Sequence, residues 1–223
     1  MRFVAAAALV TSVATLAAQS TVDRAAERWV SQTLAAMTVD EKIGQLLMAQ
    51  VVSTYIGSDS DEFERASAFV RDQHVGGFVV SGGAEAAPNV LLNTAYGTVT
   101  LGQPLEAASL INRLQARSKV PLLVAADFEG GVGFRIAGAT SFPKAMAFGA
   151  TGDERLAYSA AVISAAEARA IGVHLHFAPV ADVNNNPKNP VINTRSFGAD
   201  PARVGAFAAA WYGASPPAGR WPR

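Results

Sequence analysis

The feature that most constrains the fold is a helix-then-strand pattern that repeats along the chain. The repeats pair a helical spacing of apolar residues with a short apolar run, at 61–74 with 78–81, 104–118 with 121–126, and 153–171 with 174–180. Strands separated by helices pair in parallel and are covered by helices. The alternation therefore predicts an α/β fold built on a parallel sheet.

The chain before the first repeat adds two helices and a strand. Residues 23–37 carry one apolar stripe at helical spacing, and Trp29 is expected in the core. Thr38 and Glu41 have the spacing of a capping box, which predicts a second helix from there. With a further strand near 47–52, we expect about four parallel strands in sequence order.

Two long connections interrupt the pattern. Residues 82–103 follow one predicted strand, and residues 183–200, rich in Asn and Pro, follow another. Both leave the C-terminal ends of strands, the edge at which parallel α/β folds bind ligands. We therefore expect a binding site on that edge.

The chain is electrically balanced. It has 18 Lys and Arg against 18 Asp and Glu, so no field of one sign favours nucleic acid or an anionic membrane. Half of its 223 residues are hydrophobic, which is enough for a sizeable core and favours one domain. It has no cysteine, which excludes disulfides and a lipid-attachment cysteine.

Both termini differ from the rest of the chain. Residues 1–20 have a basic start, an apolar stretch and a small-residue exit, a pattern typical of a signal peptide. The apolar stretch is shorter than the ~20 residues that cross a bilayer, so export to a periplasm or the medium is favoured over a permanent anchor. Residues 213–223 have no periodicity, and are either an aberrant gene end or a disordered tail.

A first polar cluster follows the apolar run 121–126. It reads Asp-Phe-Glu-Gly-Gly-Val-Gly-Phe-Arg and contains Asp127, Glu129 and Arg135. In one interpretation Asp127 caps the turn and Glu129 pairs with Arg135. In the other, Asp127 binds the hydroxyls of a sugar, because an ionised carboxylate accepts two hydrogen bonds. The glycines fit neither the dinucleotide fingerprint nor a P-loop, so we expect no nucleotide cofactor.

Two histidines alternate on the last predicted strand. His174 and His176 point to the same side, a spacing that could present two imidazoles to a metal. His74 lies far upstream, and no carboxylate completes a ligand set. We therefore expect packed or hydrogen-bonded histidines, no metal and no cofactor.

Phe142 is also expected in the core.

A second cluster spans 177–198. It begins Phe-Ala-Pro-Val-Ala-Asp, continues through an Asn/Pro loop and ends in Arg-Ser-Phe-Gly. It resembles the signature of glycoside hydrolase family 3. The first cluster matches the same family's Asp-x-Glu-Gly-Gly with a downstream Arg, and residues 37–46 look like its N-terminal helix. The resemblance covers the chain from Trp29 to Tyr212 in the family's order.

The resemblance implies a TIM-type (β/α) barrel, of which residues 21–212 would form the N-terminal half. It implies that Asp127 and Arg195 bind the sugar in subsite −1, and that Arg135 binds it directly or orients Asp127. Glu129 and Asp182 would support the loops.

The resemblance also implies a retaining mechanism, with an enzymic nucleophile and a proton donor. In the family these groups lie later, the donor near a Lys-His-Phe-Pro-Gly-His-Gly motif that this sequence lacks. We therefore expect the 223-residue chain to be inactive. The two clusters look most like those of bacterial β-N-acetylhexosaminidases. A β-glucosidase-type enzyme, and a non-catalytic sugar-binding or non-functional truncated protein, stay as alternatives.

Overall fold

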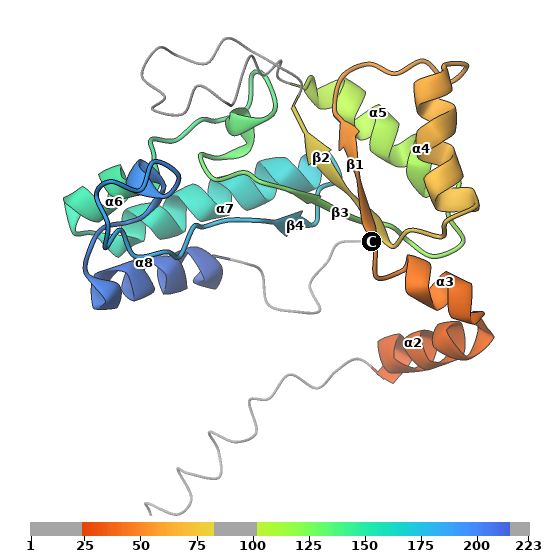
Figure 1. The fold of residues 1–223 in the computed structure, drawn as a ribbon, viewed down its shortest axis with the longest axis horizontal. Helices are drawn as coiled ribbons and strands as arrows, with labels where there is room; N and C mark the ends of the chain where they lie inside the picture. Colours follow the sequence, from red (N-terminus) through yellow and green to blue (C-terminus); the bar gives the residue numbers. More distant parts are fainter. Residues whose placement is uncertain (1–23, 83–101, 215–223) are drawn as a thin grey trace, which may run out of the picture. The chain divides into compact units, whose positions relative to one another are not determined.

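The computed structural model describes residues 24–82 and 102–214 (Figure 1). The chain divides into two units, Met1–Met37 with Pro216–Arg223, and Thr38–Ser215. The predicted signal peptide and nearly all of the predicted tail lie outside the described residues. In the first unit, helix α2 (Arg24–Ala36) has no buried residue. The prediction that Trp29 is a core residue is wrong: it is 51% exposed, because no described residue of its own unit covers the apolar stripe.

The second unit is built on one parallel sheet. Its strands are β1 (Met48–Val52), β2 (Gly77–Ser81), β3 (Leu123–Ala126) and β4 (Leu175–His176), in the order β1-β2-β3-β4 (Figure 1). Neighbouring strands are parallel, with Ala49 beside Phe78 and Phe78 beside Val124. The predicted sheet and its strand order are confirmed.

The helices of this unit lie before, between and after the strands, and most of them begin at a side-chain cap. They are α3 (Val39–Gly44), α4 (Asp61–Arg71), α5 (Pro104–Gln115), α6 (Ala145–Thr151), α7 (Glu154–Ala170) and α8 (Pro201–Gly213). The predicted capping box of Thr38 and Glu41 is present at the start of α3. Ser60, Asp153 and Asp200 cap α4, α7 and α8. The predicted helix at 61–74 ends early, before His74 takes a left-handed backbone at φ 55°.

The core lies between the sheet and these helices. Two apolar clusters join the strands to α4, α5 and the end of α7, through residues such as Phe78 and Leu110, and Val124 and Ile111. A third cluster joins the small side chains on one face of α7 to Phe207 and Trp211 of α8. The predicted core residue Phe142 packs against this third cluster. The polar loops after β3 and β4 are thus attached to a packed scaffold.

Strand β4 is much shorter than the predicted run 174–180. The amide of Phe177 still donates to the carbonyl of Ala126, at 2.9 Å, but Ala126 is the last residue of β3. Pro179 then follows, and it has no amide hydrogen to continue the ladder. Residues 177–192 are therefore irregular, and the 3₁₀ turn η3 (Asn193–Arg195) comes next.

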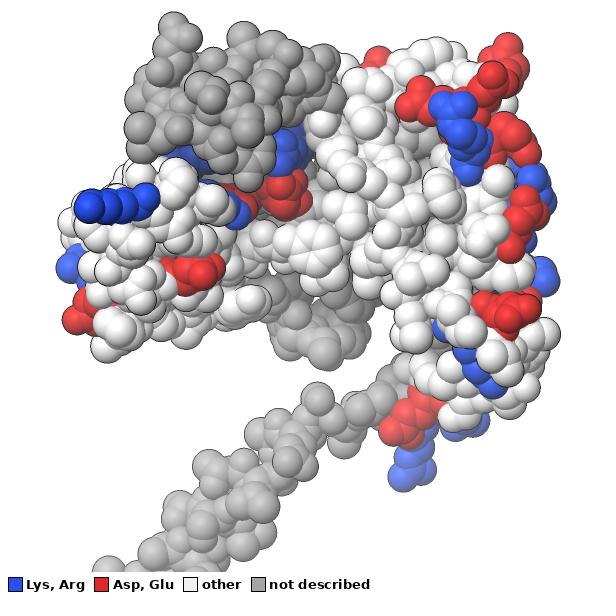
Figure 2. Space-filling model, viewed as in Figure 1, with Lys and Arg blue, Asp and Glu red and all other residues white. Residues whose placement is uncertain are grey.

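The described surface agrees with the balanced composition. Figure 2 shows Lys and Arg interspersed with Asp and Glu on the face that it draws, with no field of one sign. Within residues 24–82 and 102–214, no helix combines the length and the apolar character needed to cross a bilayer. Of the predicted connection 82–103, residues 83–101 lie outside the described residues.

Candidate active site

The first predicted site residue lies where β3 ends. Asp127 follows the buried residues Ala125 and Ala126 and forms a bidentate ion pair with Arg135. The Nε of Arg135 donates to Oδ1 of Asp127 at 2.7 Å, and its Nη2 donates to Oδ2. The Asp127 side chain keeps 33% of its surface exposed. The Asp127 carboxylate is thus paired with Arg135 and also partly exposed to solvent.

A tight glycine turn makes this pairing possible. Gly131 has φ 85°, where a side chain is strained, and a Cβ there would lie 2.6 Å from the carbonyl oxygen of Thr140. The 3₁₀ turn η2 (Val132–Phe134) follows at once and reverses the chain. Arg135 therefore returns to the strand end that Asp127 occupies.

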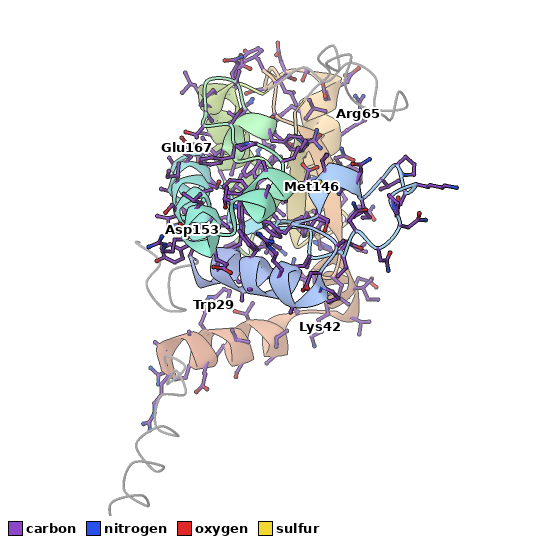
Figure 3. The ribbon with its side chains drawn as sticks, turned by 90° about the vertical axis from the view of Figure 1, so that its left-hand side faces the viewer. Trp29, Lys42, Arg65, Met146, Asp153 and Glu167 are labelled. Carbon is purple, nitrogen blue, oxygen red and sulfur yellow. The ribbon has the colours of Figure 1, made fainter. Side chains whose placement is uncertain are left out.

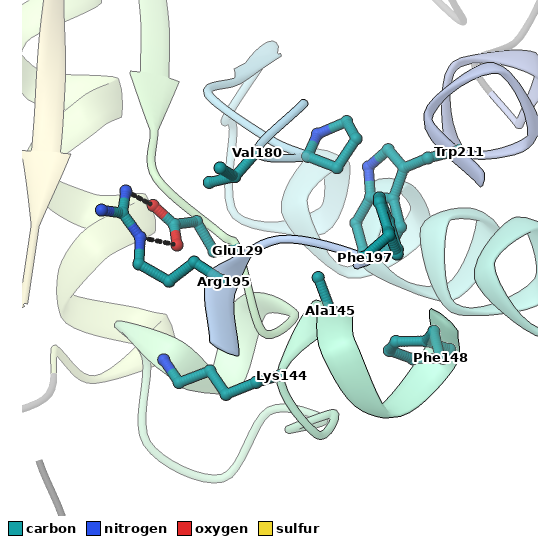
Figure 4. A pocket seen from close by; sticks show the side chains of 9 residues that line it. Glu129, Lys144, Ala145, Phe148, Val180, Arg195, Phe197 and Trp211 are labelled. Atoms are coloured by element: carbon teal, nitrogen blue, oxygen red, sulfur yellow. Dashed lines mark hydrogen bonds and ion pairs between the residues drawn. The ribbon is translucent and has the colours of Figure 1, made fainter. Parts of the chain in front are cut away.

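A second ion pair joins the loops after β3 and β4. Arg195 donates to Glu129 through Nε at 2.8 Å and through Nη2 at 2.6 Å (Figure 4). Its Nη1 also donates to the carbonyl of Val191 at 3.2 Å. Such parallel hydrogen bonds fix both side chains in one plane. Two residues 66 positions apart in the sequence are brought together at the C-terminal edge of the sheet.

These pairings correct part of the sequence interpretation. One interpretation paired Glu129 with Arg135. In the structure Arg135 pairs with Asp127, and Arg195 pairs with Glu129. The reason is steric: the glycine turn folds Arg135 back onto β3, whereas η3 presents Arg195 from the neighbouring loop.

Asp182 contributes through its backbone. Its carbonyl accepts from the Ser196 hydroxyl at 2.5 Å, and the oxygen of the same hydroxyl accepts from the Gly198 amide at 3.2 Å. The Asp182 side chain is exposed. Ser196 itself is fully buried, so the hydroxyl ties the start of the loop to its end. This closure holds Arg195, the neighbour of Ser196, at the edge of the sheet.

Lys144 is a site residue that the sequence interpretation missed. Its Nζ lies 4.5 Å from the centre of the Phe134 ring, and the guanidinium carbon of Arg135 lies 4.5 Å from the same centre. Burial lowers the pKa of Lys144, an effect that the negative charge of Glu129 opposes and the charge of Arg195 reinforces. Lys144 is the N-cap of α6 and belongs to neither motif, so the sequence carried no signal for it.

A narrow pocket opens beside the second ion pair. It encloses about 10 Å³, and Figure 4 shows Glu129, Arg195 and Lys144 at one end of it and Phe148 and Trp211 at the other. That volume holds roughly one water molecule and is far below the ~300 Å³ of a typical ligand pocket. This pocket is therefore too small to hold a sugar ring.

The two histidines are packed, as predicted. The Nδ1 of His174 accepts from the Val124 amide at 3.1 Å, and the ring of His176 meets Phe128 edge-on with centres 5.3 Å apart. Burial lowers the pKa of both imidazoles. Among the residues that the structure describes, no group of three or more His, Cys, Asp or Glu side chains could hold a metal ion.

The arrangement is suited to binding hydroxyl groups. Asp127 and Glu129 supply acceptor oxygens, and Arg135 and Arg195 supply planar sets of donors beside them. Lys144 feels the charge of all four groups, so the two pairs and the ammonium form one cluster. A cluster of fixed acceptors and donors can recognise adjacent hydroxyls of a sugar ring.

Comparisons with known proteins identify the family of this chain. Residues 38–214 match the model of the glycosyl hydrolase family 3 N-terminal domain. A β-N-acetylglucosaminidase/β-glucosidase from Cellulomonas fimi is 37% identical over 181 residues, which cover 81% of this chain and 28% of that protein. The β-hexosaminidase LpqI of Mycobacterium tuberculosis is 32% identical over 77% of this chain and 38% of its own length.

Solved structures that resemble this chain come from the same family. A family 3 β-N-acetylglucosaminidase from Paenibacillus superposes with a TM-score of 0.65 and 35% identity, over 80% of this chain and 31% of that one. The chain thus spans less than two fifths of the length of these relatives. Its parallel sheet with outer helices is the corresponding part of their TIM-type barrel. With a family model matched from Thr38 to Ala214, this chain belongs to glycosyl hydrolase family 3.

Proposed function

We propose that this chain supplies part of the sugar-binding site of a β-N-acetylhexosaminidase. The whole enzyme would release terminal β-linked N-acetylglucosamine with retention of configuration. In this proposal Asp127 and Arg195 bind ring hydroxyls in subsite −1, Arg135 orients Asp127, and Glu129 orients Arg195. Asp182 supports the loop through its backbone.

The observation that carries the proposal is the pair of carboxylate–guanidinium contacts at the C-terminal edge of β3 and β4. Both pairs keep part of their surface open, with Asp127 at 33% and Arg195 at 31% exposed. The relatives named as N-acetylglucosaminidases and hexosaminidases support the choice of sugar.

The nucleophile and proton donor of the mechanism are absent from this sequence, which has no Lys-His-Phe-Pro-Gly-His-Gly motif. The site therefore has to be tested in a complete barrel. We would replace the corresponding segment of the Cellulomonas fimi relative by residues 38–214 of this chain and measure N-acetylglucosamine binding by calorimetry.

In that chimera we expect Asp127→Ala and Arg195→Ala each to weaken binding about tenfold or more, the effect of one lost charge-assisted hydrogen bond. Arg155→Ala is the matched control, because Arg155 also forms an ion pair, with Asp153, but is 89% exposed on α7. If the folded Asp127 and Arg195 variants bind the sugar as well as the control does, the site assignment is wrong.

The same chimera separates the two branches of the family. Chromogenic N-acetylglucosaminide and glucoside would be compared at equal concentration. A preference for the N-acetylglucosaminide supports the proposal, and a strong preference for the glucoside moves the chain to the β-glucosidase branch.

The proposal includes export from the cytoplasm, to a periplasm or the medium. It is supported by the signal-peptide pattern of residues 1–20, a basic start followed by an apolar stretch and small residues. N-terminal sequencing of the protein recovered from its producing cell tests this. An intact, uncleaved N-terminus in the cytoplasm would contradict export.

A further inference from the structure

Glu167 is a half-buried carboxylate in the last turn of the Ala-rich helix α7 (Figure 3). It accepts from the Thr140 hydroxyl through Oε1 at 2.6 Å, and from the Thr140 amide through Oε2 at 3.0 Å and Oε1 at 3.3 Å. Among the described residues, the ion pairs do not include Glu167. Its side chain is therefore held by hydrogen bonds from one residue of a loop that lies 27 positions earlier.

That loop is attached in turn to the glycine turn after β3. The Gly133 amide donates to the Thr140 carbonyl at 2.9 Å, and the Phe142 amide donates to the Gly130 carbonyl at 2.7 Å. The contact is close: a Cβ on Gly133 would lie 2.3 Å from the Ser141 hydroxyl. A shift of Thr140 would therefore move the glycine turn with it.

The glycine turn sets the position of Arg135. The Arg135 amide donates to the Val132 carbonyl at 3.0 Å, and its guanidinium then meets Asp127 at the end of β3. A continuous series of hydrogen bonds thus runs from Glu167, through Thr140 and Gly133, to the turn that holds Arg135. Glu167 itself touches neither Asp127 nor Arg135 in any of these bonds.

We propose that Glu167 is a positioning residue for the Asp127–Arg135 pair. It fixes Thr140, and through Thr140 it fixes the backbone turn that aims the Arg135 guanidinium at Asp127. The importance of this pair for sugar binding rests on the proposed function above. The positioning itself is a property of the folded chain and can be measured without a sugar.

The test measures how fast phenylglyoxal modifies individual arginines of the 223-residue chain, with each site quantified by peptide mass spectrometry. A guanidinium held in a bidentate pair reacts slowly. Glu167→Ala should raise the labelling rate of Arg135 on the order of tenfold. This is the change expected when the displaced turn breaks a charge-assisted hydrogen bond between Arg135 and Asp127. Glu167→Gln should restore most of the protection, because an amide oxygen can still accept from Thr140 and its NH₂ can donate to the hydroxyl.

Arg203 is the internal control. Its Nη2 donates to the Gly149 carbonyl at 2.5 Å, so it too is held by the fold, but it lies on α8 outside this series of contacts. A general loss of structure would break this bond and raise the labelling of Arg203 and Arg135 together. If Glu167→Ala does not fold, Thr140→Val removes only the hydroxyl bond and should raise labelling of Arg135 by a smaller factor.

An unchanged rate at Arg135, or an equal rise at Arg203, overturns the proposal. A selective rise at Arg135 that Gln reverses supports it. The outcome is independent of the sugar experiment: the chimera could fail to bind N-acetylglucosamine while Glu167→Ala still frees Arg135. Positioning would then stand and the proposed function would fail.

Discussion

Gly149 is the residue of α6 against which the loop after β4 packs closely. It lies buried in α6, and a Cβ there would stand 1.7 Å from the carbonyl oxygen of Phe197, in the Arg-Ser-Phe-Gly segment. The Phe197 carbonyl belongs to the backbone, so it cannot move aside as easily as the end of a flexible side chain. The absent side chain therefore lets the loop that carries Arg195 pack directly on α6.

We expect Gly149→Ala to lower the free energy of unfolding by about 1 to 3 kcal/mol through overpacking, although Ala favours a helix. Gly205 is the matched control, because it is exposed in α8 and a Cβ there would have nothing within 4 Å. Gly205→Ala should raise stability by roughly 0.5 to 1 kcal/mol. Urea denaturation of both variants measures the difference, and equal effects would contradict the close packing.

His176 makes stability depend on pH. Burial lowers its pKa in the folded chain, so the unfolded chain binds more protons below its ordinary value of about 6.5. The free energy of unfolding should therefore fall as the pH drops from about 6.5 toward the lowered pKa. His176→Gln should flatten this dependence, measured by urea denaturation between pH 5 and 7. An unchanged slope would show that His176 is not responsible.

Single residues also show what the sequence could reveal about the site. Asp127, Glu129, Arg135 and Arg195 stood out because two motifs contain them. Which carboxylate pairs with which arginine could not be predicted, because the pairing depends on how a turn and a neighbouring loop are folded in space. Lys144 carried no signal at all, since it reaches the cluster by lying over Phe134.

At the scale of elements, side-chain caps mark where α3, α4, α7 and α8 begin. The Asp200 side chain accepts from the Arg203 amide at 2.9 Å and so starts α8, the helix whose Phe207 and Trp211 pack on α7. Asp200→Ala should cost about 1 kcal/mol, whereas Asp200→Asn retains an oxygen that can cap the helix. Thermal unfolding of the two variants tests this, and equal losses would exclude capping as the cause.

The order and direction of the strands followed from the alternation of patterns, because parallel strands need a helix between them. The length of β4 could not be predicted from these patterns. The apolar run 174–180 looks like a full strand, but pairing also requires a partner and an amide hydrogen. β3 ends at Ala126 and Pro179 has no amide hydrogen, so the ladder stops.

At the scale of the whole molecule, one face of the sheet carries exposed apolar residues. Leu123 is 45%, Leu175 38% and Phe177 47% exposed. Leu175 lies beside Ala125, and alternation along the strands puts Leu123 and Leu175 on the same face. Phe177 follows β4 two positions after Leu175. Exposed apolar residues that gather at one part of a surface promote association.

We expect the purified 223-residue chain to self-associate, and Phe177→Ser to shift sedimentation velocity profiles toward the monomer. Tyr158→Ser is the matched control, because Tyr158 is 46% exposed on α7. The Phe177 backbone bond to Ala126 remains in the variant, so the sheet is preserved. Identical profiles for both variants would show that this face does not drive association.

The strand order has a consequence for how the protein forms during synthesis. Each strand pairs only with the strands before and after it in the chain, so the ladder can grow in the order in which the ribosome delivers it. The contact between Glu129 and Arg195 cannot close until 66 further residues have emerged. Asp127, Glu129 and Arg135 therefore emerge early, and Arg195 completes the site last.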